Sequence, residues 1–324
     1  MSEYHTVGKL PPDILESEIL SLRGALRPEV LIGPGPGEDA ALIRWGGEPY
    51  LAAASDPVVG ASEGAGRLLV HVNANDIACK GGDPAWFVVT LIVPARDGSK
   101  GVRRIMEEIH AACEDLGIAV VGGHTELTER YDRAVLAGTM MGPSRRELRA
   151  ENIRADDVIL MTRHAGLEGM SIVAHDRPDL LSFLSGEELA EVRSWQNDLS
   201  VLREARLLRD AARYMHDPTE GGLAGGLLEV RRACGLGIVL DADRVPVSPL
   251  TAKASEKLGF DPFHLISSGV LLAVLGRHEA GGALSRLSRE GIPASVIGRF
   301  VESAGECESD AHEELWGLLD RPAR

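Results

Sequence analysis

The chain has 324 residues, of which 44% are hydrophobic and 26% charged, and its formal net charge at pH 7 is −15. This composition is typical of a globular protein, and the length is sufficient for two domains. The acidic balance argues against a nucleic-acid or anionic-membrane partner. Four cysteines without a C-x-x-C pair, no apolar leader and no stretch of transmembrane length predict a cytoplasmic protein.

Strands and helices alternate along the first half of the sequence. Gly81, Gly82 and Pro84 are helix stop signals after an apolar segment, and the stripe from Val102 to Leu116 has helical spacing. This alternation indicates an α/β layer. We expect helices at 11–26, 64–84 and 102–116, and strands at 40–45, 49–57, 85–94, 118–123 and 133–142.

A charged stretch at 143–157 has little apolar periodicity and suits a domain boundary, which we place after residue 148. The second half restarts with an apolar strand. We expect strands at 158–162, 237–240, 270–275 and 294–298, helical segments between 180 and 210, helices at 220–234 and between the last two strands, and a surface helix at the end of the acidic tail 302–314.

Several carboxylates stand where an apolar element ends, next to Gly, Pro or Asn. Any single one of them is most simply a turn former or helix cap. If several converge, each close pair costs on the order of 4 kcal/mol at an effective dielectric constant near 20, and a bound Mg²⁺ would remove that cost. The set comprises Glu38 and Asp39, Asp56, Asp76 after Asn75, and Asp217, with a fifth site at His124, Thr125 and Glu126 after two glycines.

Two glycine-rich segments allow two interpretations each. The loop GPGPGEDAA at 33–41 is either a plain turn or a loop that holds a charged ligand, because its prolines exclude helix and interior strand. The helix after HDPTE contains Gly221, Gly222, Gly225 and Gly226, each costing roughly 1 kcal/mol relative to Ala inside a helix. Either tight packing or an anion site at the helix N-terminus would explain these glycines.

Five motifs in this order resemble the aminoimidazole ribonucleotide (AIR) synthase, or PurM, superfamily: GEDAA, SDP, NDIACKGGDP, GGHTE and DPTEGGL. That ATP-dependent superfamily includes hydrogenase maturation protein HypE, thiamine-monophosphate kinase and selenophosphate synthetase, and the chain looks nearest to HypE and the AIR synthase-related proteins. The resemblance implies an α/β (α+β) PurM-like fold. In it, an N-terminal ATP-binding domain at 1–148 forms a dimeric β-barrel, and a C-terminal α/β domain at 149–324 packs on it beside a long ATP cleft.

The resemblance also implies roles for individual residues. The carboxylates that look like Mg²⁺–phosphate ligands are Asp39, Asp56, Asp76 and Asp217. The positions that look like nucleotide contacts are Gly35, Gly37, Asn75, Gly122, Gly123, His124, Thr125, Thr219 and Gly221. Asp76, Asp217 and Glu126 look catalytic, and Glu126 and Glu220 look able to face the acceptor.

The implied function is an Mg²⁺-dependent enzyme that transfers the γ-phosphoryl group of ATP to an amide, carbonyl or phosphate oxygen. The acceptor would be a small molecule or a group carried by a protein, and the enzyme a homodimer. The sequence ends in LLDRPAR, without the terminal cysteine on which HypE carries its reactive group. That difference keeps three alternatives open: a non-catalytic nucleotide-binding partner in metallocofactor maturation, a kinase similar to thiamine-monophosphate kinase, and a purely structural protein.

Overall fold

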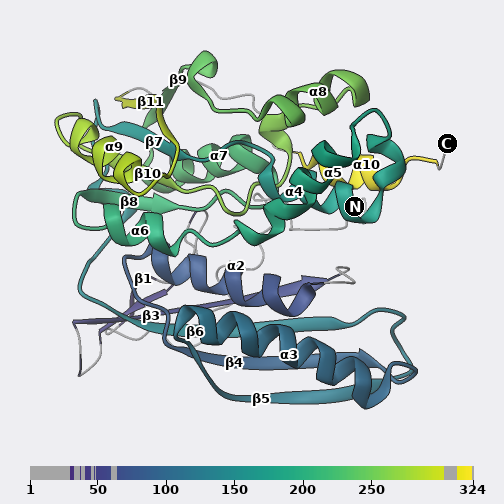
Figure 1. Ribbon diagram of the computed structural model, residues 1–324. Coiled ribbons are helices and arrows are strands. Elements are labelled where there is room, and N and C mark those ends of the chain that lie inside the picture. The colour runs from purple at the N-terminus through teal and green to yellow at the C-terminus, as the bar shows by residue number, and fades with distance from the viewer. Residues whose placement is uncertain are drawn as a thin grey trace, which may run out of the picture.

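The computed structural model describes residues 30–32, 37, 41–44, 47, 49–59, 64–302 and 312–322. Within them the chain forms two sheets, one in each half (Figure 1). The predicted helix at 11–26, Gly35, Asp39 and most of the acidic tail lie outside the described residues. No helix of the described segments combines the length and the apolar character needed to cross a membrane.

The first half forms a six-stranded sheet in the order β1-β2-β3-β6-β4-β5. All neighbours in it are antiparallel except β4 and β5, which α3 joins by a crossover. Helices α2 and α3 pack against each other and on this sheet. The elements are β1 (Val30–Ile32), β2 (Ala41–Ile43), β3 (Tyr50–Val59), α2 (Ala65–Cys79), β4 (Trp86–Pro94), α3 (Gly98–Leu116), β5 (Ala119–Thr128) and β6 (Val135–Ser144).

The second half forms an antiparallel five-stranded sheet in the order β8-β10-β7-β11-β9. Its α-helices and strands are β7 (Val158–Thr162), α4 (Leu167–Asp176), α5 (Gly186–Ser194), α6 (Leu202–Leu208), β8 (Ala212–His216), α7 (Gly222–Cys234), β9 (Gly237–Leu240), α8 (Pro249–Leu258), β10 (Leu272–Leu275), α9 (Ala280–Arg289), β11 (Ala294–Val301) and α10 (Glu314–Leu319). Short 3₁₀ turns lie at η2 (Ala150–Asn152), η3 (Pro178–Leu181), η4 (Trp195–Asn197), η5 (Ala242–Arg244) and η6 (Pro262–His264).

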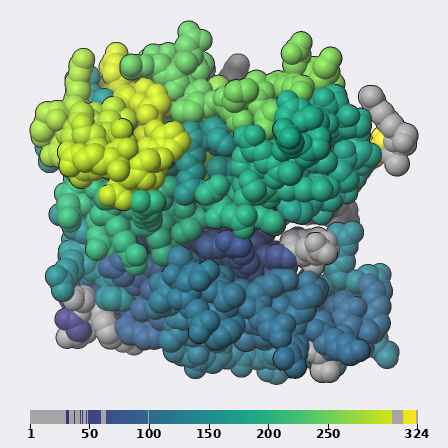
Figure 2. All heavy atoms as spheres, viewed as in Figure 1, coloured from purple at the N-terminus to yellow at the C-terminus, as the bar shows by residue number. Residues whose placement is uncertain are grey.

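Both faces of the second sheet are covered at β7 and β10, which explains why these two inner strands are buried along their whole length without alternation. Along β10, Leu272 and Val274 join the core cluster that contains Leu223 and Leu227 of α7. The alternate residues of β10 join the large cluster that also contains α6, α9 and α2. This large cluster spans both halves, so the two halves share one core along the seam seen in Figure 2.

Helix α2 lies between the two sheets (Figure 1) and is buried on nearly every side. A helix in that position needs partners for each polar side chain that it buries. Lys80, which follows the helix and is fully buried, lies with its ammonium group 5.0 Å from the centre of the Tyr214 ring. Asp83 accepts hydrogen bonds from Arg206 at 2.9 Å and Arg209 at 2.8 Å. The segment NDIACKGGDP therefore ties the two halves together.

The structure confirms most of the expected elements and corrects one of them. The sequence predicts a strand at 118–123 that ends before His124, whereas β5 continues through Thr128. It continues because β4 offers a parallel partner along its whole length, up to the pair Pro94–Thr128. The glycines do not end the strand; a Cβ on Gly123 would lie 2.1 Å from the carbonyl oxygen of Val89, so this position requires glycine.

Candidate functional site

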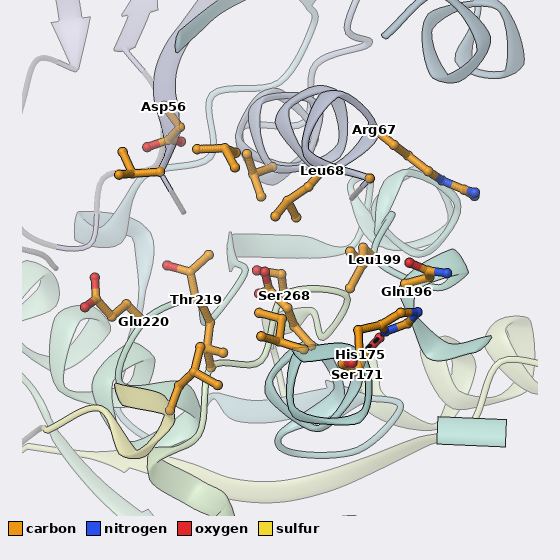
Figure 3. A pocket seen from close by; sticks show the side chains of 18 of the residues that line it. Asp56, Arg67, Leu68, Ser171, His175, Gln196, Leu199, Thr219, Glu220 and Ser268 are labelled. Atoms are coloured by element: carbon orange, nitrogen blue, oxygen red, sulfur yellow. Dashed lines mark hydrogen bonds between the residues drawn. The ribbon is translucent and has the colours of Figure 1, made fainter. Parts of the chain in front are cut away.

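A cavity of about 440 Å³ lies between the two halves. In Figure 3, Asp56 and Leu68 reach it from β3 and α2, while Thr219, Ser268 and His175 reach it from the opposite side. The described side chains that line it include five carboxylates, those of Asp56, Asp76, Glu168, Asp176 and Glu220, but only two guanidinium groups, those of Arg67 and Arg133. Its apolar wall contains Leu68, Val72, Ile172, Ile266, Leu315, Trp316 and Leu319.

Asp56 is held beside helix α2 by Asn73. The Asn73 side-chain oxygen accepts a hydrogen bond from the Asp56 amide at 2.9 Å, and its amide group donates to the Asp56 carbonyl at 3.3 Å and to the Leu69 carbonyl at 2.9 Å. Asn73 is fully buried, so these bonds satisfy a side chain that would otherwise be costly to bury. The result is a fixed position for Asp56 at the cavity.

Asp76 lines the same cavity, and the whole residue is 7% exposed. Its neighbour Asn75 does not line the cavity and has a different task. Its amide group donates to the Leu199 carbonyl at 2.8 Å, and its side-chain oxygen accepts from the Val201 amide at 3.0 Å. Both polar atoms of the Asn75 side chain are thus hydrogen-bonded to the backbone of the second half. These two bonds form a tether that fixes α2 against the segment from Leu199 to Val201.

Asp217 lies at the end of β8, almost fully buried and directly below α2. The thiol of Cys79 donates to it across 3.6 Å, and Cys79 is one helical turn from Asp76. Thr219 and Glu220, in the turn that follows, reach the cavity itself. The structure therefore brings Asp56, Asp76, Thr219 and Glu220 to one cavity, whereas Asp217 does not line it and contacts Cys79 of α2 instead.

The glycines of α7 are explained mainly by close packing. Gly221 and Gly222 have φ values of 80° and 60°, in the region that favours glycine. A Cβ on Gly222 would lie 2.5 Å from the Leu265 carbonyl oxygen, and one on Gly226 would lie 2.7 Å from the Cβ of Pro218. Tight packing, the first of the two interpretations, therefore applies.

The N-terminus of α7 is also occupied, by a carboxyl group of the chain itself. The Glu313 carboxylate accepts hydrogen bonds from the amides of Gly221 at 2.6 Å, Leu315 at 2.8 Å and Ile266 at 3.1 Å. Through Glu313, helix α10 is fastened to the turn of the DPTEGG motif, and Trp316 adds a hydrogen bond of 3.3 Å to Glu220. The Gly221 amide, expected to contact a nucleotide, is thus already engaged.

Burial raises the pKa of Glu313 to about 7, with repulsion from Glu220 adding to the effect and the backbone hydrogen bonds opposing it. The folded chain therefore holds this proton more tightly than the unfolded chain, whose glutamate pKa is near 4.5. Stability should fall as the pH rises from about 4.5 to about 7, by roughly 3 kcal/mol in total. In Glu313→Gln this part of the pH dependence should vanish, as urea unfolding at pH 4.5 and pH 8 would measure.

The matched control for Glu313→Gln is Glu256→Gln, which changes an exposed carboxylate on α8. It should keep the pH dependence of the wild type. An identical pH profile for wild type and Glu313→Gln would contradict a raised pKa at Glu313.

Other candidates from the sequence lie away from the cavity within one chain. Gly37 is buried against Glu229 of α7, and its carbonyl accepts a hydrogen bond from the Tyr214 hydroxyl. The residues from Gly122 to Glu126 lie in β5, the edge strand of the first sheet, and are exposed to solvent. In a single copy, the predicted nucleotide contacts on β5 therefore do not meet Asp56 and Asp76.

Several residues that shape the site lie outside the residues predicted from the sequence. Asn73 had a detectable signal, because an Asn inside an apolar helix needs a buried partner. Glu313 and Trp316 had none, since only the packing of α10 brings Trp316 to the cavity and Glu313 to the N-terminus of α7. Ser268 is 1% exposed and lines the cavity, and its hydroxyl has no hydrogen-bond partner in the described part of the chain. It is available to a ligand.

Within the described residues, no three His, Cys, Asp or Glu side chains form a ready-made metal site. The donor set at the cavity nonetheless suits Mg²⁺, which prefers carboxylate oxygens and usually takes only one or two of them, completing its shell with phosphate and water. Asp56 and Asp76 supply that number. The side chains present therefore fit an ion that arrives with a phosphate ligand.

Comparison with known proteins identifies the family. Residues 37–143 match the model of the AIR synthase related protein N-terminal domain, and residues 154–308 match that of its C-terminal domain. The chain belongs to the AIR synthase-related family. The comparisons confirm the predicted superfamily and fold, and with them the prediction of an enzyme of the AIR synthase and HypE type.

The chain is similar to HypE proteins over most of its length. Carbamoyl dehydratase HypE from Bradyrhizobium diazoefficiens is 31% identical over 251 residues, covering 76% of this chain and 70% of the relative. The crystal structure of Escherichia coli HypE has a TM-score of 0.69 at 25% identity, covering 79% and 80% of the two chains. A HypE structure in complex with ATP has a TM-score of 0.67 at 22% identity over 90% and 86%, which shows the shared fold.

Proposed function

We propose that this AIR synthase-related protein is an Mg²⁺-dependent enzyme that transfers the γ-phosphoryl group of ATP to an oxygen of its acceptor. The oxygen would belong to an amide, a carbonyl or a phosphate, and transfer would make it a good leaving group. The carrying observation is that Asp56 and Asp76, from different elements, line one cavity between the halves. Supporting it, the 31% identical relative is named a carbamoyl dehydratase, and HypE and ThiL structures of the same fold were solved with ATP and AMPPCP.

The charge balance of the cavity explains why a divalent cation is needed. Five carboxylates and two guanidinium groups would repel a triphosphate, and like charges about 4 Å apart cost on the order of 4 kcal/mol at an effective dielectric constant near 20. Mg²⁺ held by Asp56 and Asp76 would offset this repulsion and neutralise the transferred phosphoryl group. Asp39 and Asp217 remain proposed members of the same carboxylate set.

Calorimetric titration of the protein with ATP tests this function. We expect measurable ATP binding in millimolar Mg²⁺ and at least tenfold weaker binding in EDTA, because the carboxylates then face the phosphates directly. Equal ATP affinity with and without Mg²⁺, or no binding in either, would refute the proposal. If the protein binds ATP but releases no phosphate in the presence of any tested acceptor, the alternative of a non-catalytic nucleotide-binding partner is favoured instead.

We also infer that the protein is a cytoplasmic homodimer built on the first sheet. Among the described strands of one chain, β5 is an edge strand paired only with β4, and Val120, Val121 and Leu127 on it are 40%, 54% and 48% exposed. Pairing with a second copy would cover these side chains and give His124 and Thr125 a neighbour across the interface. Light scattering decides this point, since a mass of 34.6 kDa would mean a monomer.

A further inference from the structure

A second cavity, of about 290 Å³, lies at the junction of the two halves, away from the carboxylate-lined cavity. Its wall includes Arg146, Asn152 and Arg154 from the segment that connects the halves. The opposite wall is formed by the start of β8 and the loop after β10. The volume corresponds to about ten water molecules, enough for a small polar ligand.

Two arginines of the connecting segment have guanidinium groups for which the described residues supply no hydrogen-bond or ion-pair partner. The Nε atom of Arg146 is inaccessible to solvent and has no hydrogen-bond acceptor in the described part of the chain. Arg154 makes hydrogen bonds within that part only through its backbone: its amide donates to the Asp157 carboxylate at 2.8 Å, and its carbonyl accepts from the Asp157 amide at 3.2 Å. A buried N–H without an acceptor is costly, so a ligand that supplies one is favoured at Arg146.

A third arginine and a histidine complete the wall from the second half. Arg213 pairs with Asp157 through Nε at 2.9 Å, while its Nη2 atom lies beside Gly276. A Cβ on Gly276 would lie 3.0 Å from the His278 ring and 3.5 Å from Arg213 Nη2. The missing side chain at Gly276 therefore leaves open the space between these two donors.

The carboxylates in this wall already have partners. Both oxygens of Glu147 are engaged, one by Arg149 at 3.1 Å and the other by the Tyr50 hydroxyl at 2.9 Å. Glu279 lies 3.6 Å from His278. In a chain with a net charge of −15, Arg146 and Arg154 at this cavity are therefore not explained by ion pairs within the described part of the chain, whereas Arg213 pairs with Asp157.

We propose that this cavity binds a phosphate group, either as the free ion or as a phosphate monoester. Guanidinium groups match phosphate oxygens in geometry and charge, and the donors here converge from separate elements. The bound anion would accept from Arg146, Arg154 and the free edge of Arg213, joining the connecting segment to the second sheet. It would thereby stiffen the junction between the halves and so influence the cleft that they enclose.

The double variant Arg146→Gln/Arg154→Gln tests the proposal in the full chain. Wild-type protein with saturating Mg²⁺ and ATP is titrated with inorganic phosphate, and separately with glycerol 3-phosphate, against sodium chloride of equal ionic strength. We expect a saturable rise in the thermal unfolding midpoint for the wild type and at least tenfold weaker phosphate binding for the double variant. Tighter binding of glycerol 3-phosphate would identify a monoester as the ligand, and tighter binding of inorganic phosphate would identify the free ion.

The control is Arg130→Gln/Arg244→Gln, which removes the same charge from exposed positions outside this cavity. It should bind phosphate as the wild type does. Equal phosphate binding by all three proteins, or none by the wild type, would overturn the proposal. Arg154→Gln alone changes an exposed side chain without a partner, so it keeps the test valid if the double variant does not fold.

Discussion

Asp76→Asn is expected to weaken Mg²⁺–ATP binding on the order of 10²-fold and to abolish phosphate release with any acceptor that the wild type uses. The substitution keeps the shape of the side chain and removes, from a buried position of the cavity wall, the negative charge that we propose as a ligand of Mg²⁺. A 10²-fold change in affinity corresponds to roughly 2.7 kcal/mol. The attraction between a buried carboxylate and a cation about 4 Å away is on the order of 4 kcal/mol at an effective dielectric constant near 20, so the loss of this charge can account for the change. Calorimetry with and without Mg²⁺, together with a phosphate-release assay, measures both effects.

Asp243→Asn provides the matched control for Asp76→Asn, because Asp243 is exposed in the η5 turn and lies outside the cavity. It should bind Mg²⁺–ATP as the wild type does. Unchanged Mg²⁺–ATP affinity in Asp76→Asn would remove Asp76 from the proposed metal set. Lost phosphate release with retained binding would place Asp76 in the transfer step alone.

Asn75→Ala is expected to lower the free energy of unfolding by about 2–6 kcal/mol. The substitution removes two hydrogen bonds and leaves the Leu199 carbonyl and the Val201 amide buried without a partner, at roughly 1–3 kcal/mol each. Urea unfolding measures the change. Since Asn75 does not line the cavity, the folded variant should retain ATP binding.

Asn152→Ala is the companion experiment to Asn75→Ala. Asn152 also donates through its side chain to a backbone carbonyl, that of Glu147, but in an exposed position. Water can replace that bond, so its loss should cost less than about 1 kcal/mol. If Asn75→Ala unfolds like the wild type and instead loses ATP affinity, the nucleotide-contacting role predicted from the sequence is correct and the tether is dispensable.

Much of the fold was predictable because its signals are local. The apolar stripe from Val102 to Leu116 led to α3, and the stop signals at Gly81 and Gly82 led to the end of α2. The end of β5 was not predictable in this way. Two glycines and a polar segment resemble a strand end, and only the parallel partner β4 keeps the strand going to Thr128.

The sequence allowed the acidic residues of the candidate site to be recognised, but it did not show which of them lie together in the folded chain. Asp56 and Asp76 were recognisable because carboxylates beside apolar elements and the five ordered motifs are written in the sequence. That these two share a cavity depends on Asn73, which fastens β3 to α2 across seventeen residues. The occupation of the α7 N-terminus by Glu313 depends on a contact across 92 residues.

The amino-acid order by itself determined the family, many of the helices and strands, and the acidic side chains available to a metal–phosphate ligand, since helix stops, apolar spacing and motif order act between neighbours in the chain. Tertiary structure alone decided which acidic side chains face a common space, which polar side chains of α2 serve as tethers, and which helix end is already filled. The physical reason is that burial and hydrogen-bond partnership are properties of the packed core. Asn75 and Asp76 are adjacent in sequence and both buried, yet the packing around α2 gives one a backbone partner and the other a cavity.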